Sequence, residues 1–291
     1  MKKVLLTGAT GLIGKYAIQP LLDAGFEVFA ATIDADKKTP GVNWIKTNLL
    51  EMESIKSLFE TVKPQYLLHF AWDTTPGTYL ESDLNFKWLE SSLEMLKQFK
   101  VQGGKRAVFA GTCFEYQFQD KPINELTAGF NPTTKYARCK NQLREEATEF
   151  CAANDISFGW GRIFYVFGEG ENEGRLVPKV IKFLKEDKPM EFSVGHLIKD
   201  YMFAGDIAGG FVKFLDSDVK GCVNICTSNP VSIKELVSLI AKKLGKEHLV
   251  KFENKETTEA KIIVGDNTRL TKEVGFTPKH TLDSALDLMI K

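Results

Sequence analysis

Tyr136 and Lys140 form the first pair of residues whose types and spacing point to chemistry. They lie four positions apart, which places both on one face if the segment is helical. A phenol with a pKa of about 10 is a poor acid–base catalyst at neutral pH, and an adjacent ammonium lowers that pKa. The same spacing is common on solvated helix faces, so a role in proton transfer depends on a cofactor site elsewhere in the chain.

Such a site is indicated by residues 7–14, Thr-Gly-Ala-Thr-Gly-Leu-Ile-Gly, which follow an apolar run at residues 4–6. In a dinucleotide-binding turn, three glycines at this spacing permit the tight turn, the close approach of a pyrophosphate and close helix packing. Amides of the following helix then face the anion. A flexible turn without a ligand would also fit this spacing. The position of residues 7–14 directly after an N-terminal strand favours a dinucleotide site.

The end of the second expected strand bears on which dinucleotide binds. An acidic side chain there would bond the ribose 2′-hydroxyl of NAD, but Thr32 occupies that place. A neutral hydroxyl tolerates a 2′-phosphate better than a carboxylate does, and Lys37 and Lys38 follow closely in the sequence. We therefore expect NADP(H), with NAD(H) as the alternative that Asp34 would favour.

Composition excludes several classes of protein. The 291 residues carry 38 basic and 38 acidic side chains, so we expect no nucleic-acid partner, because a phosphate backbone calls for a basic surface. No apolar run reaches the roughly 18 residues of a membrane-spanning helix. The five cysteines form no CxxC pair and no metal-ligand pattern with histidine. We therefore expect reduced thiols, a cytoplasmic location and no bound metal.

The elements that position these residues follow from the alternation of short apolar runs with helical patterns, which is typical of βαβ units. We expect an α/β fold, a Rossmann doubly wound parallel sheet with a smaller C-terminal substrate-binding lobe. The expected strands are residues 3–7, 27–33, 65–70, 106–111 and 156–163. The expected helices are residues 14–24, 54–61, 79–99, 177–185, 204–215 (opened by Asp206) and 233–244.

The chain is expected to divide into two parts. Residues 1–163, with parts of 200–227, would form the dinucleotide-binding domain. Residues 164–199 and 228–291 are more mixed and polar, and would form the substrate lobe.

Three motifs resemble, in type and order, those of the extended short-chain dehydrogenase/reductase family, the NAD-dependent epimerase/dehydratase family. They are the glycine turn, residues 111–116 (Gly-Thr-Cys-Phe-Glu-Tyr) after a strand, and the pair Tyr136 and Lys140. The resemblance covers essentially the whole chain. It implies that Thr112 hydrogen-bonds the substrate oxygen, that Tyr136 exchanges the proton, and that Lys140 binds the nicotinamide ribose and lowers the tyrosine pKa.

The resemblance also implies a set of dinucleotide contacts. They are Gly8, Thr10, Gly11, Leu12, Ile13, Gly14, Thr32, Asn48, Leu49, Phe70, Ala71, Asn85 and Phe164. His69, in the same region, is read as a core histidine with its hydrogen bonds satisfied.

The residues after Thr112 separate the reactions known in the family. Dehydratases carry an acidic pair or Ser-Glu there, whereas this chain has Cys113 and Phe114. Enzymes that epimerise before reducing carry a cysteine two positions after the hydroxyl, so Cys113 is one position early. The chain looks instead like the nucleotide-diphosphate-4-keto-6-deoxyhexose reductases, which implies direct reduction of a C4 keto group with Tyr136 as proton donor.

The expected partner is therefore a nucleotide-diphosphate sugar. Candidate substrate contacts are Trp72, Cys113, Phe114, Glu115, Tyr165, Arg175 and Lys199. Tyr165 and Lys199 depart from the family pattern, in which asparagine and arginine are common at these places.

Two other functions use the same residues. A nucleotide-sugar 4-epimerase would keep NAD tightly bound through each turnover. A non-catalytic sensor or scaffold would bind the dinucleotide only, but such proteins usually lose the tyrosine or the lysine.

The resemblance further implies a homodimer formed through the helix at residues 79–99 and the helix that carries Tyr136.

Overall fold

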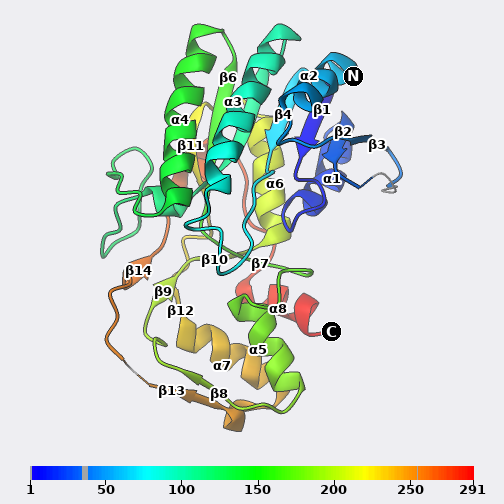
Figure 1. Cartoon of the computed structure of the whole chain (residues 1–291). Helices are drawn as coiled ribbons and strands as arrows, with labels where there is room; N and C mark the ends of the chain where they lie inside the picture. The colour runs from blue at the N-terminus through cyan, green and yellow to red at the C-terminus, as the bar shows by residue number, and fades with distance from the viewer. Residues whose placement is uncertain (1, 35–38, 254) are drawn as a thin grey trace.

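The computed structural model describes residues 2–34, 39–253 and 255–291 (Figure 1). Its centre is a seven-stranded parallel sheet of order β11-β6-β5-β4-β1-β2-β3. The strands are β1 (Lys2–Thr7), β2 (Phe26–Thr32), β3 (Val42–Lys46), β4 (Tyr66–His69), β5 (Arg106–Thr112), β6 (Ser157–Ile163) and β11 (Gly221–Ile225). The predicted Rossmann-type α/β fold is confirmed.

Both faces of the sheet are buried because helices cover each side. One face packs on α1 (Gly14–Asp23) and α6 (Ala204–Leu215). The other packs on α2 (Met52–Val62), α3 (Leu84–Val101) and α4 (Lys135–Ala153), and α3 and α4 lie side by side (Figure 1). Every residue of the interior strand β5 is buried, as expected of parallel strands covered on both faces.

The strand order reverses between β1 and β4, because β2 and β3 lie on one side of β1 while β4, β5 and β6 extend on the other. Ligands of open α/β sheets bind outside the carboxyl ends of the strands at such a point. The turns that follow β1, β4 and β5 therefore meet at this edge of the sheet.

The remaining α-helices and strands gather beyond this edge (Figure 1). They are the helices α5 (Leu176–Lys185), α7 (Ile233–Leu244) and α8 (Leu282–Ile290), with the short strands β7 (Tyr165–Phe167), β8 (Met190–Phe192), β9 (Ile198–Lys199), β10 (Tyr201–Phe203), β12 (Val231–Ser232), β13 (Val250–Phe252) and β14 (Ile262–Ile263). These helices and several of the short strands share a hydrophobic core of their own. The division into domains at residue 163 stays a prediction.

Some boundaries differ from the sequence prediction. The helix α3 begins at Leu84 rather than at residue 79, because the preceding residues form turns. Asp206 lies inside the first turn of α6 and does not open the helix. Its carboxylate instead accepts the backbone amides of Lys279 and His280 at 3.1 and 2.9 Å. No helix among the described residues is long and apolar enough to span a membrane.

Candidate active site

A cavity of about 580 Å³ opens at the carboxyl edge of the sheet. Its lining combines the glycine turn after β1, the ends of β4 and β5, the first turns of α4, and residues from the C-terminal elements. The cavity therefore lies where the strand order reverses, which is the place expected for a dinucleotide and its co-substrate.

The glycine turn forms one end of this cavity. Gly8 adopts φ of +70°, and a Cβ atom built on Gly14 would lie 2.0 Å from the Gly8 carbonyl oxygen. Among the side chains that the structure describes, none caps the first turn of α1, whose N-cap residue is Ile13. The backbone is thus packed too closely for side chains, and the helix N-terminus is open to an anion. These residues fit the pyrophosphate of a dinucleotide.

Lys140 projects from α4 into the interior and is only 3% exposed. Its Nζ donates to the backbone oxygen of Ala110 at 2.9 Å. It also lies 3.7 Å from the centre of the Trp72 ring. Burial lowers the pKa of Lys140 to about 7, against an opposing effect of the Glu115 carboxylate.

Tyr136 lies one turn earlier on α4, between the rings of Tyr79 and Trp72, whose centres are 5.0 and 6.3 Å from its own. Burial raises the pKa of Tyr136, while a hydrogen bond between its hydroxyl and that of Thr112 acts in the opposite direction. The phenol is therefore protonated at neutral pH. The structure brings Thr112, Tyr136 and Lys140 together on the wall of the cavity.

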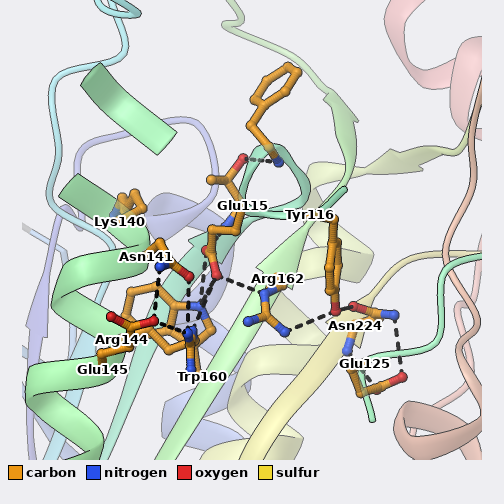
Figure 2. Close-up of polar contacts among 12 residues, drawn as sticks. Glu115, Tyr116, Glu125, Lys140, Asn141, Arg144, Glu145, Trp160, Arg162 and Asn224 are labelled. Atoms are coloured by element: carbon orange, nitrogen blue, oxygen red, sulfur yellow. Dashed lines mark hydrogen bonds and ion pairs between the residues drawn. The ribbon is translucent and has the colours of Figure 1, made fainter. Parts of the chain in front are cut away.

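Glu115 differs from the prediction that it contacts substrate. Its side chain is fully buried and does not line the cavity. One carboxylate oxygen accepts the backbone amide of Thr112 at 2.8 Å, and the other accepts from Arg162 Nε at 2.7 Å (Figure 2). Glu115 belongs to a buried polar network behind Thr112, because its carboxylate is directed into the sheet and away from the cavity.

The predicted dinucleotide contacts fall into two groups. Those on the cavity wall are Gly8, Gly11, Leu12, Ile13, Gly14, Phe70, Ala71 and Phe164. Thr10, Thr32, Asn48 and Leu49 lie outside this wall, and the contacts of these four with an adenosine stay predictions. Lys37 and Lys38 lie outside the described residues.

Asn85 is the other residue placed differently from the prediction. It is only 2% exposed and does not line the cavity. Its amide nitrogen donates to the backbone oxygens of Tyr79 and Ser82 at 2.7 and 2.8 Å. Its amide oxygen accepts from Trp72 Nε1 at 2.8 Å. Asn85 therefore supports Trp72 and the loop before α3, since its polar atoms are engaged inside the protein.

The other predicted substrate contacts line the cavity. They are Trp72, Cys113, Phe114, Tyr165, Arg175 and Lys199. Lys199 Nζ donates to the Ala260 oxygen at 3.1 Å and lies 3.9 Å from the Glu259 carboxylate. An Arg175 nitrogen donates to the Thr74 oxygen at 3.1 Å. Both cations are therefore on the cavity wall and held by backbone oxygens.

Sequence reasoning missed several residues of the wall, among them Tyr79, Glu171, Tyr201 and Glu259. Burial raises the pKa of Glu171 to about 7. Tyr201 carried a usable signal, because it lies two positions after Lys199, a residue already expected to contact substrate.

His69 is a core histidine, as predicted. Its Nδ1 is bonded to the Thr7 hydroxyl at 2.7 Å and its Nε2 to the Ser92 hydroxyl at 3.0 Å. It is only 1% exposed, and burial holds its pKa well below the usual range. His69 is therefore neutral and ties β4 to β1 and α3.

The fold and this site define a dinucleotide-dependent enzyme of the Rossmann class. The model of the NAD dependent epimerase/dehydratase family matches residues 4–226. The chain belongs to this family, which confirms the prediction made from the three motifs.

Relatives with known activities include both reductases and epimerases. The dTDP-4-dehydro-6-deoxyglucose reductase of Escherichia coli is 26% identical over 313 residues, covering 99% of this chain and 96% of that protein. The dTDP-6-deoxy-L-talose 4-dehydrogenase (NAD(+)) of Aggregatibacter actinomycetemcomitans is 25% identical, covering 80% and 87%. The UDP-glucose 4-epimerase of Thermus thermophilus, solved in complex with NAD, has a TM-score of 0.86 at 21% identity and covers 98% of each chain.

Proposed function

We propose that this protein reduces the C4 keto group of a nucleotide-linked 4-keto-6-deoxyhexose. The reduced nicotinamide supplies the hydride when it is bound. Tyr136 donates its phenolic proton to the oxygen that forms at C4, and the Thr112 hydroxyl donates a hydrogen bond to the same oxygen. Lys140 holds the ribose of the cofactor, and its positive charge stabilises the phenolate that Tyr136 becomes after it has donated its proton.

The observation that carries this proposal is the position of Tyr136, on the cavity wall with Thr112 and Lys140. Its side chain is buried between the rings of Tyr79 and Trp72, and burial raises the pKa of the phenol. Reduction requires a proton donor at this place, whereas the first half of an epimerisation requires a base that removes the C4 hydroxyl proton. A phenol with a raised pKa supports the role of proton donor, and therefore the direction of reduction.

The wall around Thr112 supports a 6-deoxy sugar. Phe114, Phe164 and Trp72 line the cavity beside the reacting groups. Against these rings a methyl group at C6 would meet an apolar surface, whereas a hydroxyl or carboxylate would lose its hydrogen bonds to water. For the other end of the ligand, Lys199 and Arg175 supply two cations for the diphosphate.

We further propose that NADP(H) is preferred over NAD(H). Thr32 is buried at the end of β2, and its hydroxyl accepts the backbone amide of Asp34 at 3.1 Å. No carboxylate thus occupies the end of the strand itself, where an acidic residue would repel a 2′-phosphate.

We also propose that the protein is a homodimer located in the cytoplasm. The helices α3 and α4 lie side by side on the outside of the sheet, and Phe86 of α3 is 47% exposed. All five cysteines are free thiols, which suits a reducing compartment. Light scattering tests the dimer, and a monomeric mass at micromolar concentration would contradict it.

A 4-epimerase is the second candidate, because the similar proteins include UDP-glucose 4-epimerases and the same three residues serve both reactions. An epimerase would retain NAD through purification and interconvert UDP-glucose and UDP-galactose without external cofactor. A non-catalytic sensor is disfavoured because Thr112, Tyr136 and Lys140 are all present and assembled in the cavity.

The decisive assay supplies dTDP- and CDP-4-keto-6-deoxyglucose with NADPH or NADH and follows absorbance at about 340 nm. We expect oxidation of the cofactor with at least one sugar, and a loss of about 10²–10⁴-fold in kcat for Tyr136→Phe. Absence of oxidation with both sugars, or equal rates for wild type and Tyr136→Phe, would contradict the proposal.

A further inference from the structure

Trp72 stands out in the cavity because its indole covers the catalytic lysine. The Lys140 Nζ lies 3.7 Å from the centre of the ring, well within the distance of about 6 Å at which a cation and an aromatic face attract each other. The two residues are 68 positions apart and belong to different elements, so the contact comes from the tertiary fold.

The indole is fixed on three sides. Its Nε1 donates to the Asn85 amide oxygen at 2.8 Å, and Asn85 is itself tied to the backbone of the loop before α3. Its ring stacks on Trp88 with centres 6.2 Å apart and planes 28° apart. Tyr136 meets it edge-on. These contacts fix the orientation of the Trp72 ring, so that one of its faces is directed at Lys140.

The other charged and titratable groups around Lys140 do little to neutralise it. The Glu115 carboxylate, behind β5, favours the charged lysine, but its oxygens are engaged by Thr112, Trp160 and Arg162. His69 of β4 is neutral. Tyr136 on α4 is a protonated phenol. Among the described residues, the buried ammonium is therefore left with one backbone oxygen and the indole face as its direct partners.

We propose that Trp72 is a positioning residue for the reaction, whose indole face holds the Lys140 side chain in its charged form beside Tyr136. The role rests on the proposed function only in treating Lys140 as catalytic. It differs from a substrate contact, because the face that bears on the lysine is not available to a sugar. Asn85 and Trp88 contribute to this positioning, because their contacts hold the Trp72 ring in place.

The variants Trp72→Phe and Trp72→Leu separate this role from simple packing. Both side chains are smaller than tryptophan and open space above Lys140, and any water that enters would raise the pKa of the lysine in either variant. Only phenylalanine keeps a π face. Trp88→Phe is the matched control, because phenylalanine keeps an aromatic ring to stack on Trp72 and no contact among the described residues joins this position to Lys140.

The measurement is the pKa of Lys140 itself, followed by NMR of the protein labelled with ¹³C at lysine Cε and assigned with Lys140→Arg. We expect the pKa in Trp72→Leu to lie about 0.5 to 1 unit below that in Trp72→Phe, with Trp88→Phe unchanged from wild type. The alkaline fall of kcat should move to lower pH in the same order. Equal pKa values for the Phe and Leu variants, or a higher one for Leu, would overturn the proposal. The titration needs no substrate, so its outcome is independent of whether the sugar reduction is correct.

Discussion

The Glu115 carboxylate lies 2.7 Å from Arg162 Nε, and solvent reaches neither side chain. The same carboxylate accepts the amide of Thr112 at 2.8 Å and Trp160 Nε1 at 3.0 Å. Arg162 continues the network by donating to the Tyr116 hydroxyl at 2.9 Å (Figure 2). The backbone of the predicted catalytic threonine is thus anchored by a buried ion pair.

Removing one partner of this ion pair should destabilise the protein strongly. We expect Glu115→Gln to lower the free energy of unfolding by about 3–5 kcal/mol, because Arg162 is left as a buried charge without a counter-ion. Urea denaturation measures the change. Glu145→Gln is the control: Glu145 is 55% exposed and pairs with Arg144 at 2.9 Å, so its loss should cost no more than about 1 kcal/mol. Equal effects of the two variants would contradict the burial argument.

The hydroxyl of Thr112 should matter for rate more than for binding. We expect Thr112→Val to lower kcat by about 10²–10³-fold, because a donor to the forming oxyanion is lost. Thr112→Ser restores the hydroxyl and should recover most of the activity. Steady-state kinetics with the keto sugar checks both variants, and a serine variant as slow as the valine variant would show that the hydroxyl is not the group that acts.

Activity should fall as the pH rises through neutrality. Burial lowers the pKa of Lys140 to about 7 in the cofactor-free chain, so the ammonium is present below this pH and is lost above it. We expect kcat/KM for the dinucleotide to decrease from about pH 7 upward, because this ratio reports on the free enzyme.

Lys140→Arg provides the control for this pH dependence, because arginine stays charged throughout the range. Its profile should lack the alkaline fall, while any titration of the cofactor itself would remain. If kcat/KM fell identically with pH in wild type and Lys140→Arg, the alkaline decrease would have to come from the titration of another group.

Cofactor preference should respond to the residue at position 32. In Thr32→Asp, a carboxylate stands where the 2′-phosphate of NADPH would approach, and like-charge repulsion opposes binding. We expect the ratio of kcat/KM values for NADPH over NADH to drop by at least about tenfold, which corresponds to about 1.4 kcal/mol. A wild-type enzyme that already favours NADH, or a ratio unchanged by the substitution, would contradict the proposed preference.

Elements that carry their own local signal could be predicted from the sequence. The glycine turn and the strands β1, β4, β5 and β6 are short apolar runs bounded by turns, and each lies close to its predicted position. The strands β3 and β11 were missed because neither reads as an apolar run. No residue of β3 is fully buried and two of its five are exposed, whereas β11 begins with an exposed glycine and contains a buried asparagine.

Contacts between distant segments could not be predicted. Glu115 is a charged residue next to a catalytic motif, and nothing near it in sequence shows that Arg162 and Trp160 enclose it. Gly111 explains part of this packing, because a Cβ there would lie 2.1 Å from Trp160 Nε1 and 2.7 Å from the Glu115 carboxylate. Asn85 was likewise expected at the cofactor, whereas the loop before α3 folds back onto it.

The most direct test of C4 reduction is the transfer of isotope from NADPH carrying deuterium at the transferable position. The enzyme is incubated with the 4-keto-6-deoxy sugar nucleotide that it accepts, and the product is analysed by mass spectrometry and NMR. We expect one deuterium at C4 of the sugar for each molecule of cofactor oxidised, and at least about 10²-fold less labelled product from Tyr136→Phe over the same time. A product without deuterium at C4, or turnover of a UDP-hexose with no net oxidation of cofactor, would contradict the assignment as a reductase.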